Sequence, residues 1–137
     1  MSRRKAREMA LQVLFQLDFN TLAIAEALQS IFEEHAENSE GSKTYTEVLV
    51  AGTQQYKVEI DSIISKLSNE WKIERMAGVD RNIARIAVYE MKFSEEKLAP
   101  NIIINEAVEL AKRFGTDDSA KFINGILGSL VKNRDNQ

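Results

Sequence analysis

The sequence of 137 residues contains no cysteine, one proline, six glycines and one histidine. Without cysteine the chain can form neither a disulfide framework nor a thiolate metal site, and it has no thiol nucleophile. The lack of cysteine also fits a reducing compartment. Because Pro100 is the only proline and glycines are few, the sequence favours helices over a turn-rich β fold.

Long apolar runs are missing as well, and residues 1–8 are mostly charged. The start of the chain therefore predicts neither a secretory signal nor a membrane span, and we expect a cytoplasmic protein. The composition, with 44% hydrophobic and 28% charged residues, is that of an ordinary globular protein. A chain of this length buries roughly two-thirds of its unfolded surface. We therefore expect residues 1–137 to form a single domain.

The net charge of −3 is unevenly distributed along the chain. Residues 1–17 have a charge of +3, residues 18–61 a charge of −7, and residues 62–137 a charge of +1. We call the cations Arg3, Arg4, Lys5 and Arg7 the basic head and residues 18–61 the acidic body. The long-range field of the acidic body repels phosphate, so any contact with nucleic acid has to be local.

Apolar residues recur with the helical period of about 3.6 in seven segments. We predict helices over residues 3–17, 24–35, 45–67, 70–76, 81–91, 101–114 and 117–131, with a loop at 37–42 and a connector at 93–99. The expected caps are Ser2, Thr21, a Thr44–Glu47 capping box, Gly78 at the end of the fourth helix, Asp80 at the start of the fifth, and Thr116. The fold class is all-α, a compact bundle of about seven helices.

The basic head lies at the start of the first predicted helix, where the helix dipole is positive and each cation is unfavourable by a few tenths of a kcal/mol. The free backbone N–H groups at the same end form an anion site, so phosphate contact would relieve both problems. A solvated terminus that only aids solubility is the alternative. The charges alone do not decide between the two.

Arg4, Glu8, Leu11 and Phe15 lie opposite the apolar stripe of this helix. An outward-facing aromatic ring near arginines could stack on a base or contact a partner. Burial of the helix on two sides is the alternative, which we favour for Leu11 and leave open for Phe15.

The last predicted helix places Asp118, Lys121 and Gly125 on its outer face, with Phe122 at the margin. Gly125 and Gly128 each cost about 1 kcal/mol relative to alanine within a helix. Close packing against another helix would explain both glycines. A shallow surface that a ligand backbone can approach is the alternative.

Arg81, Arg85 and Tyr89 share one face of the fifth predicted helix. They form either a second basic and aromatic strip or an ordinary salt-bridged surface. His35 lies on an apolar stripe and is interpreted as a structural residue at a helix end. Neighbouring acids on helices point about 100° apart and do not converge on a substrate or metal, and no nucleotide-binding motif is present. We predict a protein that is not an enzyme and needs no cofactor or metal.

Three segments carry a family resemblance: RRKARE (residues 3–8) with LQVLF (11–15), VDRNIARIAVYE (79–90), and INEAVELAKRFG (104–115) followed by DSAKFING (118–125). Through them the sequence resembles, over essentially its whole length, the NusB family of transcription antitermination factors. The third segment is long and specific. The resemblance implies an all-helical fold of two three-helix bundles with one additional helix.

The same resemblance implies a function in transcription. It implies binding to the boxA element of ribosomal RNA leaders together with the small-subunit ribosomal protein NusE, in a complex with RNA polymerase, NusA and NusG. Ribosomal RNA cytosine methyltransferases contain a similar N-terminal RNA-binding domain. Because the sequence ends at Gln137, we expect the free-standing factor. A homodimer of the free protein is compatible with the sequence but not required by it.

Site residues follow from the resemblance by position. The implied RNA-binding residues are Arg3, Arg4, Lys5, Arg7, Phe15, Lys121 and Phe122. The implied partner-binding residues are Phe15, Asp80, Asp118 and Phe122. Lys5 stands where the family commonly has arginine, and Phe15 lacks the hydroxyl of a tyrosine. The competing hypothesis is a purely protein-binding helical scaffold in which the arginines are incidental.

Overall fold

The structure is a computed structural model that describes residues 3–19, 23–37, 39–68 and 73–135. These residues form seven α-helices and no strand: α1 (Arg3–Phe19), α2 (Ile24–Glu34), α3 (Glu40–Gln55), α4 (Lys57–Leu67), α5 (Gly78–Val88), α6 (Pro100–Phe114) and α7 (Ser119–Asp135). A 3₁₀ turn, η1 (Ile73–Arg75), precedes α5, and a π-helical turn, η2 (Tyr89–Phe93), continues it. The predicted all-α fold of about seven helices is confirmed.

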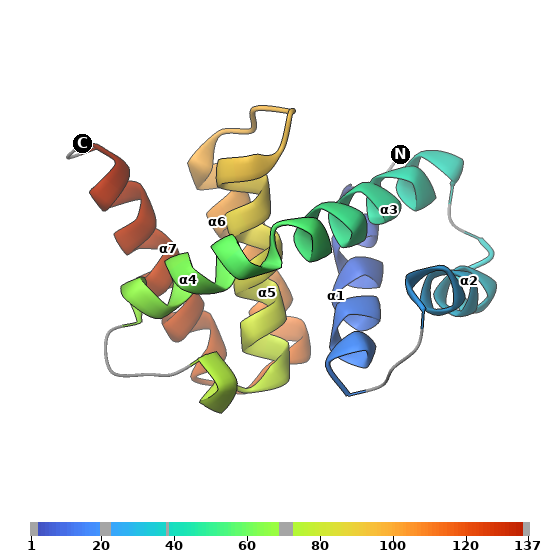
Figure 1. The fold of residues 1–137 in the computed structure, drawn as a ribbon, viewed down its shortest axis with the longest axis horizontal. Coiled ribbons are helices and arrows are strands. Elements are labelled where there is room, and N and C mark those ends of the chain that lie inside the picture. The colour runs from blue at the N-terminus through green and yellow to red at the C-terminus, as the bar shows by residue number, and fades with distance from the viewer. Residues whose placement is uncertain (1–2, 20–22, 38, 69–72, 136–137) are drawn as a thin grey trace.

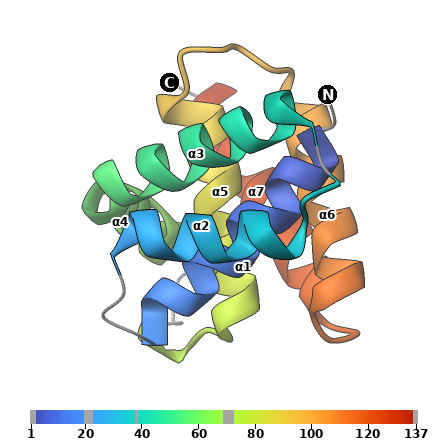
Figure 2. The ribbon, with the colours of Figure 1, turned by 90° about the vertical axis from the view of Figure 1, so that its right-hand side faces the viewer.

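The helices form two packed groups (Figures 1 and 2). α1, α2 and α3 pack against one another, as do α5, α6 and α7. α4 is the additional helix, and α3 and α4 lie nearly end to end across both groups (Figure 1). α1 also packs against α5, and this contact joins the two groups. The expected arrangement of two three-helix bundles with one further helix is therefore present.

The helix predicted over residues 45–67 is wrong at both its start and its middle. α3 begins at Glu40 because the Ser39 hydroxyl caps it, accepting a hydrogen bond from the Ser42 amide at 3.2 Å. Thr44 is inside the helix, so the predicted capping box is absent and the predicted loop over 37–42 ends early. The helix then breaks at Tyr56, whose φ of −103° and ψ of 17° separate α3 from α4.

Other predicted boundaries shift by a few residues. Gly78 is the first residue of α5, not the end of the helix before it, and it makes room for the Phe15 ring. α7 begins at Ser119 rather than directly after Thr116, whose amide donates to the Ser119 hydroxyl at 2.9 Å. Ser2, Thr21 and residues 69–72 lie outside the described ranges, so the predicted helix over 70–76 is seen only as η1.

One face of α1 packs into the first group of helices and the opposite face packs on the second. The predicted stripe is buried, and Leu11 on the other side is buried as well. The interpretation of α1 as a helix covered on two sides is therefore confirmed at Leu11. Charged residues share this interface with the apolar ones.

Near the start of α1, Arg7 forms a buried ion pair with Glu90 of η2. Both hydrogen bonds between the guanidinium and the carboxylate are 2.8 Å long, and the Tyr45 hydroxyl also donates to Glu90 at 2.6 Å. Burial opposes the charged form of Arg7, but the hydrogen bond and charge of Glu90 outweigh it and raise the pKa of Arg7.

Near the end of α1, Asp18 accepts hydrogen bonds from three side chains of α5. The distances are 2.9 Å from Arg81 Nη2, 2.8 Å from Asn82 Nδ2 and 3.0 Å from Arg85 Nη1. Arg85 also donates to Asp61 of α4 at 2.8 and 2.9 Å. Arg81 and Arg85 thus belong to a salt-bridged network, while Tyr89 is buried. The alternative of an exposed basic and aromatic strip is wrong.

We expect Asp18→Asn to lower the free energy of unfolding by about 3 kcal/mol, because it removes the charge that compensates two arginines in a poorly solvated place. Asp117→Asn, at an exposed position, is the matched control and should change stability little. Urea denaturation followed by circular dichroism measures both. Equal effects of the two substitutions would contradict the assigned role of Asp18.

The same carboxylate should make stability depend on pH. Burial alone would raise the pKa of Asp18, but the hydrogen bonds from Asn82 and Arg81 lower it below its ordinary value of 3.8. The stabilisation is complete above pH 3.8 and is lost as the pH falls through the lower pKa of the folded state. The stability difference between wild type and Asp18→Asn should therefore shrink below that pH.

Candidate nucleic-acid interface

Arg4 of the basic head and Phe15 lie along a groove between α1 and α6, which run in the same direction. Arg4 on α1 pairs with Glu106 on α6, and one turn further Glu8 pairs with Arg113. These four residues line a cavity of about 150 Å³. A second cavity of about 240 Å³ follows, lined by Leu11, Gln12, Phe15, Gln16, Val79 and Phe114.

The cations at the end of the groove near the start of α1 are paired with carboxylates. Arg4 donates two hydrogen bonds to Glu106, at 3.0 and 3.1 Å, and its side chain is 60% exposed. Lys5 is also exposed and lies 3.5 Å from Glu8. The hydrogen bond from Arg4 lowers the pKa of Glu106, so this carboxylate is charged at neutral pH. A phosphate that binds Arg4 has to compete with Glu106.

Arg3 and Arg7, the two other cations of the basic head, are less accessible to a phosphate. Arg3 donates to Glu96 at 2.9 Å, and its guanidinium lies 3.9 Å from the centre of the Tyr45 ring. Arg7 is only 4% exposed, and Glu90 holds it in the interior. The predicted RNA contact of Arg7 disagrees with this burial. A helical register that brings Arg4 to the surface directs Arg7 into the interface with α5.

Aromatic side chains lie at the other end of the groove, near the end of α1. Phe15 is 37% exposed, and its ring centre lies 5.0 Å from that of Phe19. The sequence left open whether Phe15 is buried or faces outward. In the structure its side chain is partly exposed, and one edge of the ring lies against Gly78. Glycine at the start of α5 leaves space for that ring, because a Cβ at Gly78 would lie 2.9 Å from the Phe15 ring.

A third cavity, of about 440 Å³, lies beside the start of α5 and α7. It is lined by Arg75, Met76, Ala77, Asp80, Asp118 and Phe122. Three of the four residues predicted to bind a partner are thus brought together, although they come from two segments of the sequence. The Oδ1 atom of Asp80 is buried and has no hydrogen-bond partner within the described part of the chain. An unsatisfied carboxylate oxygen of this kind can accept a donor from another molecule.

The outer face of α7 continues this region. Lys121, Gly125 and Gly128 are exposed. Nothing lies within 4 Å of the position that a Cβ would take at either glycine. Close helix packing therefore does not explain them, and the shallow-surface interpretation agrees with the structure.

Arg113 is a residue of this groove that the sequence did not single out. Its side chain is 59% exposed, and Nη1 lies 2.8 Å from Glu8. Its guanidinium is 5.3 Å from the centre of the Phe114 ring. A basic residue directly before an aromatic one was the available signal. It was missed because cations in the last turn of a helix are already explained by the dipole.

The two ends of the groove are far enough apart to contact several nucleotides. Arg4 and Phe15 are eleven residues apart on one helix, which corresponds to about 17 Å along its axis. At a rise of roughly 3.4 Å per nucleotide, this distance equals about five nucleotides of a stacked strand. The groove thus suits a short single strand, with phosphate contacts at one end and base contacts at the other.

No group of three or more metal-ligating side chains occurs within the part of the chain that the structure describes. His35 is the C-cap residue of α2, at a helix end as expected, with Nδ1 3.8 Å from Glu37. In the described ranges no helix is long and apolar enough to cross a membrane.

The fold and this groove define an all-helical binding protein with a cationic end and an aromatic end on one face. Transcription antitermination protein NusB of Bdellovibrio bacteriovorus is 47% identical over 131 residues, which cover 96% of each chain. The Bacillus subtilis protein of the same name is 45% identical over 130 residues, 95% of each chain. A crystal structure of antitermination factors NusB and NusE in complex with dsRNA matches with a TM-score of 0.87 and 30% identity, covering 96% of each chain. Residues 4–132 match the NusB family, and this chain belongs to it.

We expect Gly125→Ala to raise the free energy of unfolding by up to about 1 kcal/mol, because alanine is the better helix former and its methyl group meets no atom. Gly52→Ala is the contrasting variant: its Cβ would collide with the Tyr89 ring, and we expect a loss of stability. Thermal or urea unfolding measures both. A destabilised Gly125→Ala protein would show that this face is not open.

Proposed function

We propose that this protein is a transcription antitermination factor that binds boxA-type RNA of ribosomal RNA leaders together with the ribosomal protein NusE. The role is regulatory and non-catalytic. Family membership supports it, since relatives at 45–47% identity carry the name transcription antitermination protein. The observation that carries the RNA contact is the groove between α1 and α6, which ends in exposed Arg4 at one side and half-exposed Phe15 at the other.

Phosphates bind at the basic end of the groove and bases at the aromatic end. Arg4 and Lys5 are the exposed cations of the head, and Arg113 extends the positive surface toward Phe15. Phe15 and Phe122 present ring surface on which unpaired bases can stack. Lys121 lies beside Phe122 and supplies a further phosphate contact.

The internal ion pairs make RNA binding selective. Arg4 has to exchange Glu106 for a phosphate, and Lys5 has to exchange Glu8. Phosphate contacts alone then gain little over the contacts already present, and the acidic body repels other nucleic acids. RNA that also places bases on Phe15 and Phe122 binds with a net gain.

The cavity with Asp80 and Asp118 is where we place the protein partner. A basic ribosomal protein complements its two carboxylates, and Phe122 belongs to both surfaces. Phe15, in the neighbouring cavity, contacts RNA and partner alike. In this proposal residues 1–137 act as one domain in the cytoplasm, and the complex joins RNA polymerase with NusA and NusG.

We expect Arg4/Lys5→Ala to weaken boxA-type RNA severalfold and to reduce the slope of log affinity against log salt by about 0.7 per lost phosphate contact. Lys66/Lys132→Ala removes the same charge from exposed positions on α4 and α7 and is the matched control. Fluorescence anisotropy over a salt series, with boxA-type and scrambled RNA, measures both variants.

Glu106→Gln should act in the opposite direction. It keeps the shape of the side chain but removes the charge that competes for Arg4, so both RNAs should bind more tightly and differ less. If no variant changes RNA binding while the partner still binds, the protein is a protein-only scaffold and the RNA sites are wrong.

RNA and partner should strengthen each other's binding by the same factor, because both touch the surface around Phe122. Titrating RNA with and without NusE, and NusE with and without RNA, measures the two factors. Asp118→Asn should reduce the NusE affinity, whereas Asp117→Asn, the adjacent exposed acid, should not. Independent binding of RNA and NusE would contradict the shared surface.

A further inference from the structure

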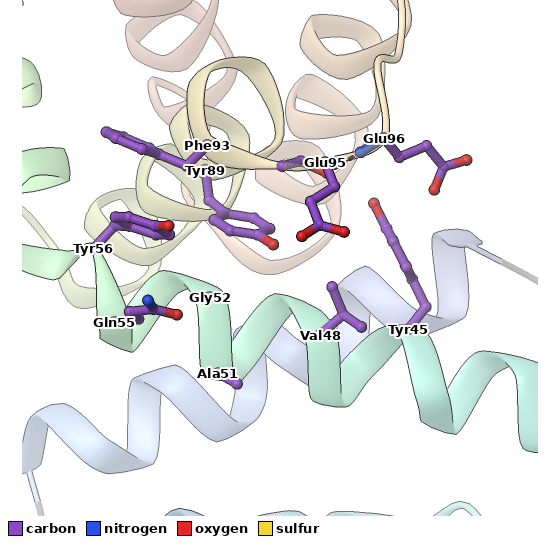
Figure 3. A pocket seen from close by; sticks show the side chains of 11 residues that line it. Tyr45, Val48, Ala51, Gly52, Gln55, Tyr56, Tyr89, Phe93, Glu95 and Glu96 are labelled. Atoms are coloured by element: carbon purple, nitrogen blue, oxygen red, sulfur yellow. Dashed lines mark hydrogen bonds between the residues drawn. The ribbon is translucent and has the colours of Figure 1, made fainter.

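A separate cavity of about 440 Å³ lies between α3 and the turn η2. It is at the opposite end of α5 from Asp80 and is not part of the groove described above. Figure 3 shows the side chains that surround it. One wall carries Tyr45, Val48 and Gly52 of α3 and Tyr56, which follows this helix, and the facing wall carries Tyr89, Phe93, Glu95 and Glu96.

Aromatic rings form the floor of this cavity. The rings of Tyr56 and Phe93 are stacked at 4.6 Å with an angle of 14° between them, and Tyr89 follows at 6.5 Å from Tyr56. Gly52 has no side chain at the point where the Tyr89 ring approaches α3. Val48 is 43% exposed at the rim, so apolar surface faces solvent beside the rings.

The carboxylate of Glu95 is directed into this aromatic cavity (Figure 3). It forms no ion pair with any residue in the described ranges, whereas its neighbour Glu96 pairs with Arg3. Burial, and after it the nearby negative charge of Glu95, raises the pKa of Tyr89, in agreement with the position of this carboxylate beside the ring. A negative charge beside aromatic faces favours a cation.

The protein itself shows how this wall holds a guanidinium. Arg3 lies 3.9 Å over the Tyr45 ring and donates to Glu96 at 2.9 Å, at the edge of the same cavity. Tyr89 and Glu95 repeat this combination of an aromatic ring and a carboxylate further inside. The residues that line the cavity include the carboxylates Glu95 and Glu96 and no lysine or arginine. Phosphate is disfavoured here for the same reason.

We propose that the cavity binds an arginine side chain of a basic segment in a protein partner. The planar guanidinium stacks on the tyrosine rings and pairs with Glu95, and its methylene stem covers Val48. Lysine fits less well, because its ammonium group does not stack and is more strongly hydrated. The site is independent of RNA binding in the groove, so it can hold a second protein while RNA is bound.

Nuclear magnetic resonance titration of the full chain tests this proposal with three short capped peptides that differ only in a central arginine, lysine or citrulline. Citrulline has nearly the shape of arginine without its charge. We expect the arginine peptide to shift the amide signals of Gly52, Ser94 and Glu95, with an affinity roughly tenfold above that of the citrulline peptide.

Glu95→Gln should remove most of that difference, while Glu59→Gln, at an exposed position on α4, is the matched control and should keep it. Neither residue is buried, so both variants should fold, and their amide spectra report this directly. Equal binding of the arginine and citrulline peptides would overturn the proposal, as would shifts confined to other regions. A single-stranded RNA that shifts the same signals would overturn the assignment to a protein partner.

Discussion

Two buried ionic contacts between α1 and the continuous segment of α5 and η2 determine how the rest of the molecule is arranged. Arg7 pairs with Glu90 at one end of these antiparallel helices, and Asp18 pairs with Arg81 and Arg85 at the other. A slip of one helical turn, about 5.4 Å, would separate both sets and leave charges buried without partners, at a cost of several kcal/mol each. Because α1 belongs to one bundle and α5 to the other, this register also fixes how the two bundles meet.

The groove depends on that register. With α1 held in place, Arg4 faces Glu106 of α6, and Phe15 reaches Gly78 at the start of α5. Cations and aromatic rings from α1, α6 and α7 then lie on one face at a separation that suits a few nucleotides. The buried network also explains why only some of the four cations of the basic head are accessible to another molecule. Arg7 holds the two bundles together, whereas Arg4 and Lys5 are exposed.

The sequence was sufficient for the fold class and for most helices, because amphipathic periodicity reports which face of a helix is buried. The prediction failed at the start of α3, where two residues both have side chains that can cap a helix. Ser39 and Thr44 are both good capping residues, and in the structure Ser39 caps α3 while the Thr44 hydroxyl donates to the Glu40 carbonyl inside the helix. The motif resemblance assigned Phe15, Asp80, Asp118 and Phe122 to a binding surface, and the structure brings the last three together around one cavity, while their roles stay predictions. It could not separate Arg7 from Arg4, because ion pairing with Glu90 across 83 positions leaves no local pattern.

The groove and the cavity between α3 and η2 have opposite charge preferences, which follow from the same distribution of residues. The groove collects cations whose carboxylate partners are on neighbouring helices, so an incoming phosphate replaces a carboxylate and the local charge balance is kept. In the cavity between α3 and η2 the carboxylate of Glu95 has no such cation among the described residues, so an incoming guanidinium completes a pair. An RNA phosphate therefore replaces the carboxylate partner of a cation in the groove, whereas a guanidinium in the cavity gives Glu95 an ionic partner.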